Sequence, residues 1–276
     1  MSTIRREKKR KLENLSKSHK NETFYTVIWL LVLVSFWEIA PRVGLANEYL
    51  LPTFSSTVKT MWQQITVGTL GHQLWSSLKL VFVGVIISVV ISILATFLCI
   101  YSKVFESLFR ALCTVFNPLP GLAVLPLIMM WFGIGTGAMI VLIIHGIVWP
   151  LVDELLAGYR SVPPIYRDFS KNIGLNAFKE TFHMLIFAIM PNFLSGIRIG
   201  WGRAWRALIG AEMVFGMMGD YGGLGYYIYV QRAYANIPRM MAGVLVIVIL
   251  GILIDQFVFR LIEKLTIEKW GMANAK

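Results

Sequence analysis

Residues 159–180 read YRSVPPIYRDFSKNIGLNAFKE and form a polar stretch between two strongly apolar ones. One apolar run covers residues 138–158, and the other covers about 188–216. As helices, runs of this length can cross the roughly 30 Å hydrocarbon core of a bilayer. A plain connection between two membrane spans does not need a short helix, a glycine and a second short helix. The stretch is therefore interpreted as a docking element for a soluble partner.

The composition is that of a membrane protein. Of the 276 residues, 57% are hydrophobic and the mean hydropathy is +0.66, whereas soluble domains contain about 45–50% apolar residues. Long apolar runs predict six transmembrane helices, over residues 23–40, 75–100, 108–131, 138–158, 188–216 and 239–260. We expect an all-α membrane protein whose single transmembrane domain covers residues 23–270.

The Lys and Arg residues indicate the orientation in the membrane, and they explain the net charge of +11 without nucleic-acid binding. If the N-terminus is inside, the segments predicted to be cytoplasmic hold 17 of these residues, including Arg260 at the membrane edge, and the outer segments hold three. Cytoplasmic loops of membrane proteins are enriched in Lys and Arg. Both termini, a basic tail over residues 1–22 and a short tail over 271–276, are therefore predicted to be cytoplasmic, together with the loop 159–187.

Two outer segments are predicted to hold short helices. In residues 41–74, apolar residues recur at helical spacing from Val58 to Ile65, after a run of capping residues over 55–57. This pattern predicts an amphipathic helix on the outer face. In residues 217–238, glycines are followed closely by tyrosines, which predicts a tight turn and a short interfacial helix.

The sequence contains no pattern for catalysis or metal binding. It has no Gly-x4-Gly-Lys-Ser/Thr phosphate loop and no Gly-x-Ser-x-Gly nucleophile turn. Cys99, Cys113 and the four histidines lack ligand spacing. We therefore expect a chain that is not an enzyme and has no catalytic residues, metal site or cofactor. His145 lies in the middle of a span, where a titratable group can mark a functional site, and a neutral histidine packed between helices is the preferred interpretation.

Proline residues interrupt the third apolar run. Residues 117–135 read NPLPGLAVLPLIMMWFGIG, with Pro118, Pro120 and Pro126. Each proline removes a backbone donor and disturbs the carbonyl one turn earlier. Freed backbone groups are tolerated in a membrane where they are buried in protein or line a wet cavity. The stretch therefore predicts a broken helix that lines a path, and an ordinary kinked packing helix is the alternative.

Charged residues in the fifth span indicate what such a path would carry. Arg203 and Arg206 are three residues apart, so they share one helix face, and two cations facing a pore would favour an anionic solute. The alternative is that the arginines extend to the lipid headgroups, as expected for Arg198. Arg206 and Glu212 lie too deep for this and are expected to pair with polar groups of neighbouring helices. The candidate path residues are Asn117, Pro118, Pro120, Arg203, Arg206 and Glu212.

The loop 159–187 resembles the cytoplasmic "EAA" loop of permease subunits of ABC-type importers, whose pattern is Glu-Ala-Ala-x3-Gly-x9-Ile-x-Leu-Pro. Residues 168–170 (Asp-Phe-Ser) occupy the acid-Ala-Ala positions, and Gly174 occupies the glycine position. Asp replaces Glu, bulkier residues replace both alanines, and Ile186–Phe187 stand where Leu-Pro would be. Pro191 matches a second proline that is common in the nitrate/sulfonate/taurine/bicarbonate subfamily.

The resemblance to that subfamily continues over roughly residues 70–270 as an ordered series of short motifs. They are Pro118–Leu119–Pro120, Leu125–Pro126–Leu127, Trp131–Phe132–Gly133–Ile134–Gly135, Gly196–Ile197–Arg198, Ala211–Glu212–Met213 and Gly223–Leu224–Gly225. The loop motif alone is moderately specific, whereas the ordered series is far more so.

This resemblance implies the fold and the partners. It implies a type I importer permease with six transmembrane helices, whose 159–187 loop forms a coupling helix that sits in a groove of an ABC ATPase subunit. It also implies a second permease copy, as a homodimer or with a close relative, and an extracytoplasmic solute-binding protein. The implied location is a bacterial inner membrane, crossed several times. The implied contacts with the ATPase are Tyr166, Arg167, Asp168, Phe169, Ser170, Gly174 and Leu175.

The solutes of this subfamily are nitrate, sulfonates, taurine, bicarbonate and some uncharged or cationic heterocycles. The arginines favour a small anion, and ATP hydrolysis is expected in a separate subunit. An autonomous secondary transporter or channel is the alternative, although the chain offers few intramembrane acids for ion coupling. A membrane enzyme or scaffold is the third hypothesis.

Overall fold

The computed structural model describes residues 24–172, 174, 186–217 and 222–269, and within them all regular structure is helical. Four helices in this part of the chain are long and apolar enough to cross a membrane: Phe24–Arg42, Leu70–Tyr101, Thr136–Ser161 and Ile237–Ile267. The bent pair Lys103–Phe116 and Gly121–Phe132 makes a fifth candidate. The prediction of an all-helical chain with several apolar spans is confirmed. The tails 1–22 and 271–276 lie outside the described residues, and the predicted ends of the domain stay predictions.

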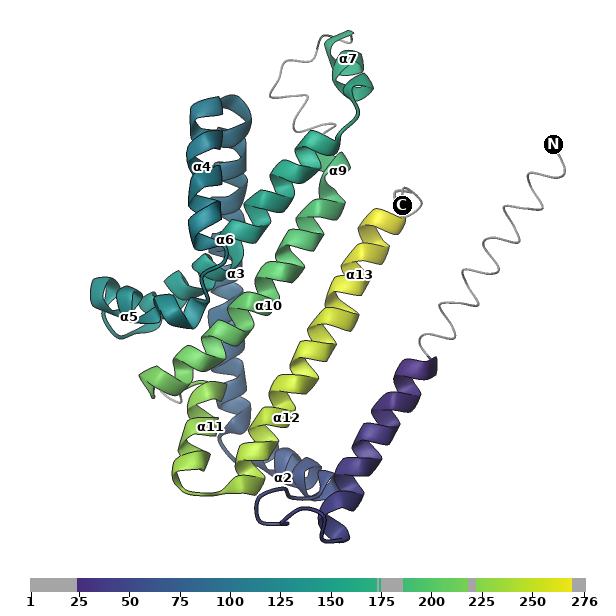
Figure 1. Ribbon diagram of the computed structural model, residues 1–276, viewed down its shortest axis with the longest axis vertical. Coiled ribbons are helices and arrows are strands. Elements are labelled where there is room, and N and C mark those ends of the chain that lie inside the picture. The colour runs from purple at the N-terminus through teal and green to yellow at the C-terminus, as the bar shows by residue number, and fades with distance from the viewer. Residues whose placement is uncertain (1–23, 173, 175–185, 218–221, 270–276) are drawn as a thin grey trace, which may run out of the picture.

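Helices α6 (Thr136–Ser161) and α10 (Met190–Phe215) form the centre of the bundle and pack along each other (Figure 1). Small residues at every fourth position of α10, Gly196, Gly200 and Ala204, make this contact close. A Cβ atom on Gly200 would lie 3.0 Å from the Cα atom of Ile147 on α6. Helices in membranes associate through such small-residue ridges, because the two backbones can then approach closely.

Helix α10 covers most of the predicted span 188–216. It lies inside the bundle, with other helices packed around it. Its 26 residues are enough to cross a membrane. It contains Arg198, Arg203, Arg206 and Glu212, and it is therefore not among the helices that are apolar enough to be candidate spans. Helices α3 (Leu70–Tyr101), α6 and α11 (Leu224–Ala233) pack around it. The side chains that are almost completely enclosed in this cluster include Leu70, Met139, Ile143, Ile147, Leu151, Leu208, Leu224 and Tyr227.

The predicted span 108–131 is two helices rather than one. Helix α4 (Lys103–Phe116) and helix α5 (Gly121–Phe132) are bent by 109° relative to each other, and in Figure 1 α5 extends sideways from the bundle below the upright α4. Pro118 and Pro120 lie in the connection, where their missing N–H groups cannot continue the helix. The predicted break is therefore confirmed at these two prolines, whereas Pro126 lies inside α5 without breaking it.

Short helices cover one end of the bundle, as predicted. Helix α2 (Phe54–Thr66) packs on the start of α12 (Ile237–Leu253), and α11 lies beside them (Figure 1). The expected capping residues 55–57 are inside α2. The cap is Thr53, whose side chain accepts a hydrogen bond from the Ser56 N–H at 3.3 Å. Thr53 can take this role because its backbone is not helical, as a capping residue requires.

Helix Phe24–Arg42 stands apart from the bundle and is attached at one end (Figure 1). The indole N–H of Trp37 donates to the Pro52 carbonyl at 3.0 Å, and the Ser55 N–H donates to the Glu38 carboxylate at 2.9 Å. Most of its apolar side chains are exposed, which fits a helix surrounded by lipid.

At the opposite end, helix α7 (Pro164–Asn172) follows α6 and projects beyond the ends of α6 and α10 in Figure 1. The remaining elements are α9 (Ile186–Ala188), which leads into α10, and the continuation of α12 through the π-helix Ile254–Phe259, α13 (Arg260–Glu263) and the π-helix Lys264–Glu268.

Candidate functional site

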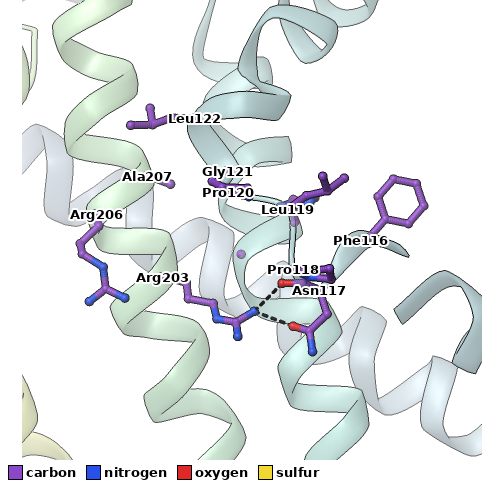
Figure 2. Close-up of a pocket in the computed structure, with 12 residues that line it drawn as sticks. Phe116, Asn117, Pro118, Leu119, Pro120, Gly121, Leu122, Arg203, Arg206 and Ala207 are labelled. Atoms are coloured by element: carbon purple, nitrogen blue, oxygen red, sulfur yellow. Dashed lines mark hydrogen bonds between the residues drawn. The ribbon is translucent and has the colours of Figure 1, made fainter. Parts of the chain in front are cut away.

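A cavity of about 390 Å³ lies at the break between α4 and α5. The connection and the first turn of α5, from Phe116 to Leu122, form one wall, and side chains of α6 and α10 form the other (Figure 2). Five of the six predicted path residues share this cavity: Asn117, Pro118, Pro120, Arg203 and Arg206. Residues that lie 86 positions apart in the chain are thus brought together at one site.

Arg203 ties α10 to the helix break. Its Nη1 atom donates to the Asn117 carbonyl at 3.1 Å and to the Asn117 Oδ1 atom at 2.5 Å (Figure 2). The prolines that follow Asn117 cannot supply the N–H groups that a continuous helix would offer. The Arg203 guanidinium therefore supplies the Asn117 carbonyl with a donor that the helix backbone would otherwise provide. A guanidinium has five N–H groups, so others can bind a ligand.

Arg206 lies one turn further along α10, and its side chain points away from Asn117 (Figure 2). It is exposed in the structure, whereas Arg203 is half-buried. Within the described residues, no carboxylate forms an ion pair with either arginine. Two uncompensated cations beside one cavity give that cavity a positive potential, which attracts anions.

Glu212, the sixth predicted path residue, lies outside this cavity in a buried network. Its carboxylate accepts hydrogen bonds from the Ser77 hydroxyl at 2.6 Å and from the Gly225 N–H at 2.8 Å. The Ser77 hydroxyl in turn accepts from the Leu224 N–H at 2.9 Å. Glu212 is 3% exposed. Through these hydrogen bonds it holds the start of α11 against α3 and α10. The start of a helix is also the end at which a negative charge is stabilised.

Glu212 also borders a second cavity, of about 260 Å³, beside Lys79 of α3 and Thr136 of α6. Neither Ser77 nor Lys79 was among the residues predicted from the sequence. Lys79 could have been identified from the sequence, since a charged residue inside a long apolar run is uncommon. Ser77 had none, because a serine in an apolar helix is an ordinary residue.

Arg198 of α10 is joined to the continuation of α12, and its expected contact with headgroups stays a prediction. Its Nε atom forms an ion pair with Asp255 Oδ1 at 3.0 Å, and its guanidinium lies over the Phe259 ring. A second ion pair joins Glu106 of α4 to Arg160 at the end of α6. Both pairs tie helices together near the end of the bundle that carries α7.

Helix α7 exposes apolar side chains. Ile165, Tyr166 and Phe169, which share one face, are 71%, 50% and 55% exposed. Asp168 is exposed in the middle of the helix. Gly174 follows the helix with a φ of +73°, and a Cβ atom there would meet nothing within 4 Å. The side chains of Arg167 and Ser170, and the whole of Leu175, lie outside the described residues.

Residues 88–267 match the family described as "Binding-protein-dependent transport system inner membrane component". The chain belongs to this family. The matched part of the permease runs from the middle of α3 through the last π-helix, and it contains both the cavity at the helix break and α7. The predicted resemblance to permeases of ABC-type importers is confirmed.

Several relatives of this permease have names that belong to the predicted subfamily. It is 28% identical to the putative aliphatic sulfonates transport permease protein SsuC of Bacillus subtilis, over 87% of this chain and 84% of that protein. It is 26% identical to the taurine transport system permease protein TauC of Escherichia coli, over 86% of each chain. It is 26% identical to the nitrate import permease protein NrtB of Synechocystis, over 68% of this chain and 67% of that protein.

Proposed function

We propose that this chain is the membrane-spanning permease subunit of an ATP-driven importer for a small anion such as a sulfonate, taurine, nitrate or bicarbonate. The observation that carries the proposal is the cavity at the proline break, where Arg203 and Arg206 have no carboxylate partner within the described residues. A binding protein delivers the anion from outside, and separate ATPase subunits supply the energy. The chain itself has no catalytic role.

The solute class follows from the charge of the path. Broken helices are tolerated in a membrane where they line a wet cavity, and an arginine there favours an anion. The names of the relatives, which concern sulfonates, taurine and nitrate, also indicate an anion. Asn117, Pro118 and Pro120 shape the path, and Arg203 and Arg206 attract the solute. Glu212 supports the path from its outer end through α11.

Helix α7 is the docking element for the ATPase in this proposal. Its exposed apolar face lies beyond the spans, where lipid would not cover it if the excess of Lys and Arg marks this side as cytoplasmic. Tyr166 and Phe169 are suited to fill a groove of the partner, since aromatic side chains commonly anchor protein interfaces. Asp168 anchors the loop, and Gly174 turns the chain. Arg167, Ser170 and Leu175 complete the proposed contact.

A second copy of the chain completes the path, so that two permeases enclose one route across the membrane. In this arrangement α10 is the sixth spanning helix beside the five apolar candidates. The domain covers residues 23–270, the loop 159–187 and both termini are cytoplasmic, and the membrane is the bacterial inner membrane. The exposed Arg206 then faces the shared path instead of lipid.

Purification from native membranes in mild detergent tests the proposal. An ABC ATPase subunit is expected to co-purify, as identified by mass spectrometry, and Phe169→Asp should lower its recovery roughly tenfold or more, because losing an aromatic anchor costs about 2 kcal/mol. Tyr49→Asp is the matched control, since Tyr49 is 86% exposed at the other end of the molecule. Recovery of the chain alone, also under ATP-trapping conditions, would favour an autonomous transporter.

Arg206→Gln is expected to lower anion uptake roughly tenfold or more, because a hydrogen bond to a charged group contributes about 1.5–3 kcal/mol. Uptake of taurine, methanesulfonate, nitrate and bicarbonate by the complete transporter in proteoliposomes measures this. Arg232→Gln is the control, because Arg232 is also an exposed arginine but lies in the last turn of α11, outside the cavity. An equal loss in both variants would contradict a specific role for Arg206.

A further inference from the structure

We infer that His145 contacts the solute in the cavity at the helix break and donates an imidazole N–H to its anionic group. This inference rests on the proposed function and adds a residue to the path. His145 lies in α6 and lines the same cavity as Arg203 and Asn117. The sequence alone predicted a histidine packed between helices, and the surroundings of the imidazole ring argue against that role.

The imidazole has polar atoms that the protein leaves unsatisfied. Both ring nitrogens of His145 are buried, and neither has a hydrogen-bond partner within the described residues. Buried polar side-chain atoms in folded proteins are nearly always paired, and each exception needs an explanation. A residue kept only for packing would be replaced without loss by an apolar side chain of similar shape.

The neighbours of the ring hold it in place without offering it an acceptor. The rings of Phe116 and Trp149 each lie 6.4 Å from the imidazole centroid, both edge-on, and they stack on each other at 5.1 Å. Aromatic contacts of this kind restrain a ring through packing. The torsion that turns the imidazole is broad, so a small rotation about the Cβ–Cγ bond presents a nitrogen to the cavity.

The cavity then offers complementary groups for a compact oxyanion. A neutral imidazole provides one N–H donor and one acceptor, and a guanidinium provides five N–H groups in a fixed fork. Arg203 uses its Nη1 atom for Asn117, and its remaining N–H groups form no hydrogen bond within the described residues. A sulfonate, a nitrate or a bicarbonate presents several oxygens on one atom, so it can accept from Arg203 and His145 together.

Two variants separate this role from packing. His145→Phe keeps a ring between Phe116 and Trp149 but removes both nitrogens, and His145→Gln keeps a donor and an acceptor. His72→Phe is the control, because His72 is an exposed histidine near the start of α3, outside the cavity. Each is assembled with its ATPase and binding protein in proteoliposomes, and uptake of taurine, methanesulfonate, nitrate and bicarbonate is measured beside the thermal unfolding midpoint.

We expect His145→Phe to lower uptake roughly ten- to a hundredfold, the loss that accompanies a hydrogen bond to a charged group. Its unfolding midpoint should equal or exceed that of the wild type, because an unsatisfied buried polar group has been removed. His145→Gln should restore most of the uptake. If His145→Phe does not assemble, His145→Leu removes the same nitrogens with less bulk and carries the same prediction.

The outcomes distinguish this inference from the proposed function. Wild-type uptake of one of the four anions, with the same rate in His145→Phe, overturns the role of His145 and leaves the importer proposal intact. Loss of uptake together with a lower midpoint, without rescue by His145→Gln, makes the residue a packing residue and also overturns the inference. Failure of the wild-type transporter to take up any of the four anions counts against both.

Discussion

Gly174→Asp is expected to leave the protein in the membrane and to lower solute-dependent ATP hydrolysis by the assembled transporter at least tenfold. Gly174 has a φ of +73°, and a Cβ atom there meets nothing within 4 Å. The isolated chain therefore has space for the new side chain and loses only about 1–2 kcal/mol to the left-handed backbone. In the proposed complex the loop sits in a groove of the ATPase, where a buried carboxylate without a partner is far more costly.

The measurement is ATP hydrolysis by the complex in nanodiscs, with binding protein and solute, normalised to the amount of permease in the membrane. Gly44→Asp is a closely matched control, because Gly44 has a φ of +76° and also meets nothing within 4 Å, but lies at the other end of the molecule. It should keep coupled hydrolysis. Normal coupling in Gly174→Asp would remove the loop 159–187 from the proposed docking site.

The positions of most helices could be predicted from the sequence because a long apolar run in lipid has one way to satisfy its backbone. The run 138–158 became α6, and the run 75–100 became most of α3. The break at Pro118 and Pro120 could also be predicted from the local sequence, since each proline removes a backbone donor at a known position. Element type and approximate bounds followed from these rules.

The direction of the chain after the break could not be predicted in the same way. The 109° bend places Asn117 against Arg203, 86 residues further along the chain. That meeting depends on tertiary packing, since α4, α5 and α10 all pack on α6. A sequence signal for this packing was present in the spacing of Gly196, Gly200 and Ala204, which is typical of close helix pairs in membranes. It identifies a contact face but not the partner helix.

Glu212 illustrates the same limit within the candidate site. Its depth in an apolar segment predicted a polar partner, and the structure contains one in Ser77, which lies 135 residues away in sequence. Nothing in the sequence distinguishes Ser77 from its neighbour Ser76, because the choice depends on the rotation of α3. The depth of a charge can be read from the sequence, whereas its hydrogen-bond partner follows from tertiary packing.

Gly225→Ala is expected to prevent accumulation of folded permease. A Cβ atom on Gly225 would lie 2.1 Å from the Ile209 carbonyl oxygen and 2.8 Å from the Glu212 Cβ atom. The carbonyl belongs to the backbone of α10 and cannot turn aside, so α11 must move. Overpacking of this kind costs roughly 3 kcal/mol or more, out of a net stability of about 5–15 kcal/mol for a typical domain. The yield of monodisperse protein and its unfolding midpoint in detergent measure the effect.

The control is Gly251→Ala in α12, where a Cβ atom meets nothing within 4 Å. This variant should be neutral or slightly stabilising, because alanine favours a helix over glycine. An unchanged midpoint in Gly225→Ala would show that α11 does not need its close contact with α10.

The loss in Gly225→Ala should exceed the steric cost, because moving α11 also withdraws the Gly225 N–H from Glu212. Glu212 is 3% exposed, and among the described residues its carboxylate would then keep only the Ser77 hydroxyl as a donor. Glu212→Ala removes the same network from the other side, although it keeps the Cβ atom that the new methyl group meets. Because the two changes act on one network, the double variant should lose less stability than the sum of the single variants. Additive losses would mean that the clash and the buried carboxylate act independently.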